Sequence, residues 1–131
     1  MLLVDAANVV GARPDGWWRD RAGATERLLG RLADADLTAP DGSRITEVVA
    51  VVEGRARDVA APEGLRVVRA EGSGDDTLVA CANELADAGT PLVVVTADRG
   101  LRARLPAGIP VLGPGRLLAA LVEPADRSRP T

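Results

Sequence analysis

Short apolar runs recur along the chain, and each of them ends at a polar residue or a turn. The runs are Met1–Val4, Ile45–Val52, Leu65–Arg69, Pro91–Thr96 and Ile109–Leu112. Several of them are apolar throughout instead of alternating between apolar and polar positions, which is typical of strands buried on both faces of a parallel sheet. The pattern therefore predicts five strands.

Segments with helical signals separate most of these runs. Helices are predicted at Thr25–Ala35, Asp75–Ala88, Asp98–Leu105 and Gly115–Val122, whereas Ala6–Gly23 is rich in Gly, Pro and Arg and is predicted to be a loop. Strands that alternate with helices indicate a three-layer α/β/α sandwich around a mainly parallel sheet of about five strands. We expect one domain over residues 1–122 and a disordered, charged tail over residues 123–131.

Acidic residues stand where the predicted strands end. Asp5 ends the first run, Glu53 follows the second and Asp98 follows the fourth, while the pair Asp75–Asp76 stands at a predicted helix start. Right-handed crossovers bring the carboxyl ends of parallel strands to one edge of the sheet, and open α/β sheets bind their ligands at that edge. These acids are therefore expected to converge, although they lie far apart in the sequence.

The composition narrows the chemistry that this edge can carry. The 131-residue chain has no His, Lys, Tyr or Phe and a single Cys. It therefore cannot form a Ser–His–Asp triad, a Cys–His pair, a lysine Schiff base or a lysine-bearing phosphate loop. Any catalysis would depend on carboxylates, and carboxylates gathered in one place usually hold a hard divalent cation such as Mg²⁺ or Mn²⁺.

Each acidic motif also has a simpler structural explanation. Asp5 with Asn8 could form an Asx-type turn, and Asp98 could cap the next helix. Acids such as Asp75 and Asp76 are ordinary in a first helical turn. Their joint placement on one edge favours a metal-binding and catalytic site over these separate explanations. In that site, Asn8 would orient the carboxylate of Asp5.

Other polar residues near this edge are candidates for supporting roles. Glu53 is either an outer ligand or a solvated strand end. The candidates for substrate contact are Arg99, Arg13, Arg19, Arg102, Ser73 and Trp17. Arg suits bidentate phosphate contact, and Trp17 could stack on an unpaired base. Ordinary surface arginines, and a Trp that packs its loop against the domain, explain the same residues without a ligand.

The net charge and the targeting signals say less about function than the acidic motifs do. The formal net charge of −3 does not decide the partner, because leaving out the four candidate aspartates makes the remainder +1. A single Cys gives no disulfide framework, the N-terminus lacks a signal-peptide pattern, and no apolar run approaches the ~20 residues that a membrane span needs. We expect a cytoplasmic protein without a membrane partner. A homodimer and a protein partner such as an antitoxin both stay open.

Three motifs, VDAAN at residues 4–8, GSGDD at 72–76 and TADRGL at 96–101, resemble those of the PIN-like ribonucleases. The resemblance is closest to their NYN (YacP-like) branch, a Rossmannoid fold, and extends from Met1 to about Val122. It places the family's acids on Asp5, Asp75, Asp76 and Asp98, its Asn on Asn8 and its Ser/Thr on Thr96. Ala6 departs from the pattern, since the branch usually has Gly there.

The resemblance implies a Mg²⁺- or Mn²⁺-dependent nuclease that hydrolyses phosphodiester bonds in RNA, which we expect to be single-stranded. In-line attack of water would leave a 5′-phosphate and a 3′-hydroxyl. Two other functions stay open. One is a metal-dependent phosphohydrolase of free nucleotides, which would need a closed pocket for the base. The other is a non-catalytic module with the same fold that binds nucleic acid or protein.

Overall fold

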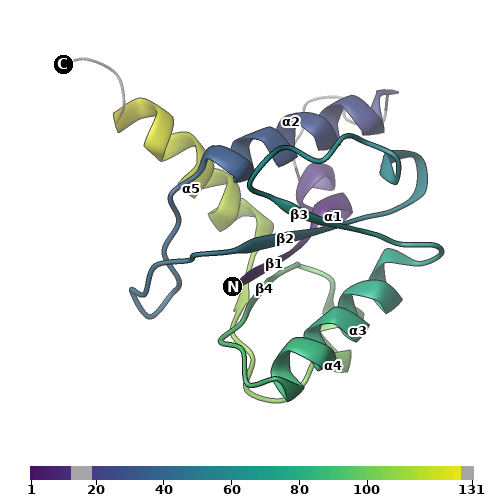
Figure 1. The fold of residues 1–131 in the computed structure, drawn as a ribbon, viewed down its shortest axis with the longest axis vertical. Helices are drawn as coiled ribbons and strands as arrows, with labels where there is room; N and C mark the ends of the chain where they lie inside the picture. Colours follow the sequence, from purple (N-terminus) through teal and green to yellow (C-terminus); the bar gives the residue numbers. More distant parts are fainter. Residues whose placement is uncertain (13–18, 128–131) are drawn as a thin grey trace.

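The computed structural model of the chain describes residues 1–12 and 19–127 (Figure 1). The strands are β1 Leu2–Asp5, β2 Val48–Val52, β3 Arg66–Arg69, β4 Val93–Val95 and β5 Val111–Leu112. The helices are α1 Ala6–Gly11, α2 Arg21–Asp34, α3 Gly74–Asp87, α4 Arg99–Arg104 and α5 Pro114–Arg127, with a 3-10 turn, η2, at Gly54–Ala56. All strands pair in parallel, in the order β3-β2-β1-β4-β5.

The central strand of the sheet is β1, and its apolar sequence explains this position. All four of its residues are buried. Leu2 lies opposite Val48 of β2 on one side and opposite Val93 of β4 on the other. A strand with neighbours on both edges and helices on both faces has no exposed positions, so an uninterrupted apolar run suits it.

Each face of the sheet has its own helices, because successive strand residues point to opposite faces. Leu2 and Val4 belong to a buried cluster with apolar residues of α1, α2 and α5. Leu3 belongs to a second cluster with residues of α3 and α4. Figure 1 shows the same division, with α1, α2 and α5 on one side of the strands and α3 and α4 on the other. The predicted three-layer α/β/α fold with a parallel sheet is confirmed.

The first helix was not expected from the sequence. Residues Ala6–Gly11, predicted to be a loop, form α1 directly after β1. Asp5 caps this helix by accepting a hydrogen bond from the backbone N of Asn8. Val9 and Val10 are buried in the core, and this burial stabilises a six-residue helix that would not persist in isolation.

The later helix ends agree with the prediction in one case and differ in the other. At the end of α3, Gly89 has a φ of +74°, the left-handed conformation expected of a glycine that closes a helix. The last helix continues to Arg127, past its predicted end at Val122. Within residues 1–12 and 19–127, no helix is long and apolar enough to cross a membrane.

Candidate active site at the carboxyl edge of the sheet

The carboxyl ends of β1 and β4 meet where the strand order reverses. From β1 the chain adds β2 and β3 on one side, and it then returns to place β4 and β5 on the other. A crevice forms at such a reversal, because the connections on its two sides leave toward opposite faces of the sheet. Asp5 ends β1, and Thr96 directly follows β4. Both residues therefore stand at this crevice.

The carboxylate of Asp5 is buried and held by two hydrogen-bond donors. Asp5 is only 7% exposed. The backbone N of Asn8 donates to Oδ1 at 3.4 Å, and Thr96 Oγ1 donates to Oδ2 at 3.2 Å. Thr96 Oγ1 in turn accepts from the backbone N of Asp98 at 3.2 Å. These bonds fix the orientation of Asp5 from both neighbouring segments.

The side chain of Asn8 joins α1 to the segment after β4. Its Oδ1 accepts from the backbone N of Ala97 at 2.8 Å. The orienting contact that Asn8 makes with Asp5 therefore comes from its backbone, while its amide holds the ends of β1 and β4 side by side. Asp98 has a similar local role, since its Oδ1 accepts from the backbone N of Leu101 and caps α4.

Glu53 follows β2 and holds the start of α3. Its Oε2 accepts from the backbone N of Gly74, the first residue of α3, at 2.5 Å. A carboxylate is favourable there because the unpaired N–H groups of a helix N-terminus carry partial positive charge. A Cβ on residue 74 would lie 2.6 Å from the Glu53 Cδ, so a larger residue here would displace the Glu53 carboxylate. The glycine before the acidic pair is the sequence signal that could have indicated such a close approach.

Neighbouring carboxylates act electrostatically on Asp5 and on Asp75 at this edge of the sheet. Burial is the main cause that raises the pKa of Asp5 to about 6, and the charges of Asp75 and Glu53 add to it, while its two hydrogen bonds oppose the rise. The pKa of Asp75 is also raised, by burial and then by the charges of Asp98 and Glu53. The structure thus links Asp75 and Glu53 to Asp5, and Asp98 and Glu53 to Asp75, through the charges that they exert on one another. Like charges held this close favour protonation or a bound cation.

Asp76, the second acid of the pair, lies differently. Its Oδ1 is 2.7 Å from Arg104 Nη2, in an ion pair whose side chains are 70% and 48% exposed. The charge of Asp75 acts on Asp5, and the charges of Asp98 and Glu53 act on Asp75. Asp75 is therefore the member of the pair that faces the other acids.

The acids of the crevice suit a divalent cation in their chemistry, since Mg²⁺ and Mn²⁺ prefer carboxylate oxygens. In the part of the chain that the structure describes, no three His, Cys, Asp or Glu side chains are arranged so that they could hold a metal ion together. Asp5 is fixed by its hydrogen bonds, whereas Asp75 and Asp98 are only half-buried. A cation would therefore require these two side chains to turn toward Asp5.

Of the residues predicted to contact the substrate, those that the structure describes are exposed. Arg19, Arg99 and Arg102 are exposed. Ser73 is the exposed N-cap residue of α3, and its side chain makes no capping hydrogen bond. Arg13 and Trp17 fall outside residues 1–12 and 19–127, so their predicted roles stay predictions.

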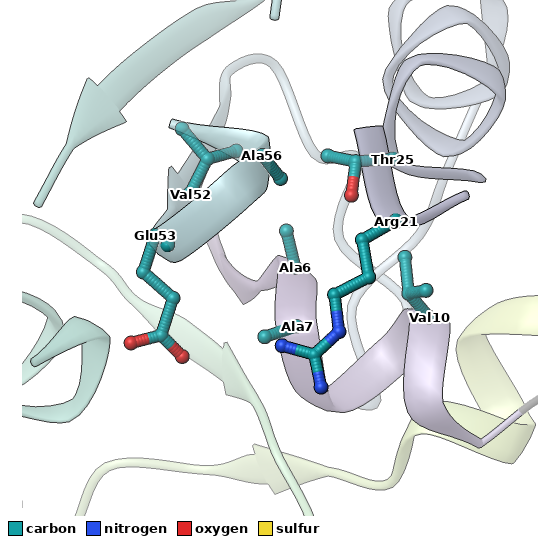
Figure 2. A pocket seen from close by; sticks show the side chains of 9 residues that line it. Ala6, Ala7, Val10, Arg21, Thr25, Val52, Glu53 and Ala56 are labelled. Carbon is teal, nitrogen blue, oxygen red and sulfur yellow. The ribbon is translucent and has the colours of Figure 1, made fainter. Parts of the chain in front are cut away.

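A cavity of about 400 Å³ opens beside the crevice, between β2, η2, α1 and the start of α2 (Figure 2). Its walls include the small or apolar residues Ala6, Val10, Val52 and Ala56. Sequence reasoning missed this cavity because these residues come from separate elements, and alanines give no signal of a space until the elements are assembled. The carboxylate of Glu53 borders both the cavity and the acids.

The assembled chain resembles a solved structure. That structure is Rae1 (YacP) from Bacillus subtilis. The match covers 96% of this chain and 77% of that chain, with a TM-score of 0.68 and 20% sequence identity. No protein-family model matches the sequence, and no curated protein matches it significantly. The YacP-like resemblance that the motifs indicate is therefore confirmed for the fold.

Proposed function

We propose that this chain is a metal-dependent ribonuclease that hydrolyses phosphodiester bonds of single-stranded RNA at the crevice between β1 and β4. The main support is that Asp75 and Glu53 act electrostatically on Asp5, and Asp98 and Glu53 on Asp75, at the switch point of a fold like that of Rae1 (YacP). The motifs indicate the type of reaction, because they resemble those of the YacP-like branch of metal-dependent ribonucleases.

Asp5, Asp75 and Asp98 would hold a Mg²⁺ or Mn²⁺ ion, and Glu53 would be an outer ligand. When bound, such an ion activates water and neutralises negative charge on the phosphate. Asp5 would be the anchor of this ligand set, because its carboxylate is already oriented by hydrogen bonds from Asn8 and Thr96. Little conformational freedom is then lost when a ligand arrives.

The acids of the chain would also accept the proton of the attacking water. A carboxyl group whose pKa is raised above its ordinary value accepts a proton more readily than an ordinary aspartate. We assign this role to Asp75, whose pKa is raised and which is less buried than Asp5. Neither His nor Lys is present to share the task.

The phosphodiester backbone would pass over α4. Arg99 and Arg102 are exposed on this helix, which begins directly after Asp98. A guanidinium group binds phosphate oxygens through two parallel hydrogen bonds. These arginines would therefore place a phosphate beside the acids that act on it.

The proposal is tested by incubating the protein with Mn²⁺ and a generic single-stranded RNA, with nucleoside triphosphates assayed in parallel. We expect 5′-phosphate products from RNA, intact triphosphates, and a loss of at least about 100-fold in Asp5→Asn. Glu26→Gln changes an exposed acid on α2 and is the matched control, expected to cut as the unmodified chain does. Intact RNA after incubation with either metal would contradict the proposal.

The two members of the acidic pair are tested separately. We expect Asp76→Asn to weaken cleavage less than Asp75→Asn does, because Asp76 pairs with Arg104 while Asp75 faces the other acids. Cleavage rates of the two variants are compared on the same RNA. Equal losses would mean that Asp76 leaves Arg104 to act as a ligand.

A phosphohydrolase of free nucleotides is a second candidate, which the cavity beside Glu53 favours because it could enclose a base. Hydrolysis of triphosphates without cleavage of RNA would support it. If neither substrate is hydrolysed and Mn²⁺ does not stabilise the protein, the fold serves as a non-catalytic binding module.

A further inference from the structure

The cavity beside the crevice has walls that suit a flat apolar ring. Val10 and Val52 present branched apolar side chains, and Ala6 and Ala56 leave the space that larger residues would fill. Its volume of about 400 Å³ lies within the usual range of small-molecule sites. None of these four residues is needed to orient the acids, so the cavity is a separate feature of the same edge.

Thr25 provides a polar group inside this cavity. The residue is only 3% exposed, and Figure 2 shows its hydroxyl turned into the open space. Within the described residues this hydroxyl has no hydrogen-bond partner. No fully buried polar side-chain atom of the described chain lacks a partner, so the hydroxyl is reached from the cavity itself. A ligand that enters can therefore take up this hydrogen bond.

Two charged side chains stand at the opening. Figure 2 shows Arg21 and Glu53 on either side of Ala7. Glu53 acts electrostatically on both Asp5 and Asp75, so the opening lies one side chain away from the acids. A ligand with an apolar ring, a polar ring edge and an attached phosphate matches this arrangement.

We propose that the cavity receives the base of one unpaired nucleotide of the RNA, next to the bond that is cut. The apolar walls contact the faces of the ring, Thr25 bonds to its edge, and Arg21 faces the adjoining phosphate. This inference rests on the proposed ribonuclease function. It adds that the protein holds its substrate by one base as well as by the phosphate backbone.

The test uses variants that alter the cavity without opening the core. Ala7 is exposed and borders the opening, so Ala7→Leu obstructs entry while the buried walls stay unchanged. Ala80→Leu makes the same change at an exposed position of α3, away from the cavity, and is the matched control. Thr25→Val removes the hydroxyl and keeps the shape of the side chain.

Cleavage is measured on one oligoribonucleotide and on a set in which one nucleotide at a time lacks its base. For the unmodified chain we expect cleavage of a given bond to fall about tenfold or more when one particular neighbouring base is missing, because burial of that ring is lost. Ala7→Leu should cut the complete RNA at this lower rate and no longer respond to the missing base. Ala80→Leu should behave like the unmodified chain.

Equal cleavage of all the base-lacking RNAs, with Ala7→Leu as active as the unmodified chain, would overturn the inference and leave the ribonuclease proposal standing. If the unmodified chain cuts no RNA, that proposal fails, and the cavity is then judged by calorimetric titration with nucleoside 5′-monophosphates in EDTA. Binding that Ala7→Leu and Thr25→Val weaken and Ala80→Leu keeps would support a base site. Binding of inorganic phosphate alone, or no binding, would overturn it.

Discussion

Replacing Asp5 with Asn is expected to make the protein more stable while it removes the activity. The carboxylate is buried near Asp75 and Glu53, and its pKa is raised from 3.8 to about 6. In the unfolded chain Asp5 has its ordinary pKa. Ionisation of Asp5 at neutral pH therefore lowers the stability of the folded state. A shift of roughly two pKa units corresponds to about 3 kcal/mol of lost stability at neutral pH.

The sign of this effect fixes its pH dependence. Below pH 3.8, Asp5 is protonated in both the folded and the unfolded state, and it costs no stability. The cost grows as the pH rises from 3.8 to about 6 and is constant above that. Asn does not ionise and avoids the cost at every pH. It has one acceptor oxygen where the carboxylate used two, and the lost hydrogen bond should cost about 1 kcal/mol.

The free energy of unfolding is measured by urea titration with far-ultraviolet circular dichroism, in EDTA. We expect Asp5→Asn to be more stable by about 2 kcal/mol at pH 7.5 and to lose this advantage at pH 4. The exposed control Glu26→Gln should stay within about 0.5 kcal/mol. Added Mn²⁺ should stabilise the unmodified chain and leave Asp5→Asn unchanged. An Asn variant that is no more stable at pH 7.5 would refute this reasoning.

Two further variants test the hydrogen bonds around the crevice. Thr96→Val removes the donor to Asp5 and the acceptor of the Asp98 backbone N. We expect the free energy of unfolding in urea to fall by about 1–3 kcal/mol, and Thr96→Ser should largely restore it. Because the Thr96 hydroxyl lowers the pKa of Asp5, the valine should also move the acidic limb of the cleavage–pH profile to higher pH; an unmoved limb would contradict this. Gly74→Ala should displace Glu53 from the start of α3 and cost about 1–2 kcal/mol, whereas Glu53→Gln should cost less because its amide oxygen can still accept the bond.

The fold could be predicted because β1, β2 and β4 are buried on both faces, and such burial leaves no position for a polar side chain until the strand ends. The same reasoning could not predict α1. Its sequence, Ala6–Gly11, is too short for a helical period to be visible, and its stability comes from Val9 and Val10 in contact with the rest of the core. Tertiary contacts, which no local pattern contains, determine this helix.

The acids could be placed on one edge because the topology of a parallel sheet determines where strands end. The direction in which each acidic side chain points could not be predicted from the sequence. Neighbouring residues of a helix point about 100° apart, so Asp75 and Asp76 leave the first turn of α3 in different directions. The ion pair with Arg104 decides which of them turns away, and this contact joins residues of two helices. The cavity at Thr25 could not be predicted from the sequence either, because residues of four separate elements form it.

The hydrogen bonds that tie β1 to the segment after β4 also determine when the site can form. Thr96 bonds to Asp5 across 91 positions of the sequence, and Ala97 bonds to Asn8 across 89. Closing so long a loop costs chain entropy, and contacts at such separation are slow to form. During synthesis, Asp5 leaves the ribosome well before the residues that orient it, which follow β4. The acidic site is therefore completed only after β4 has been made and has joined the sheet.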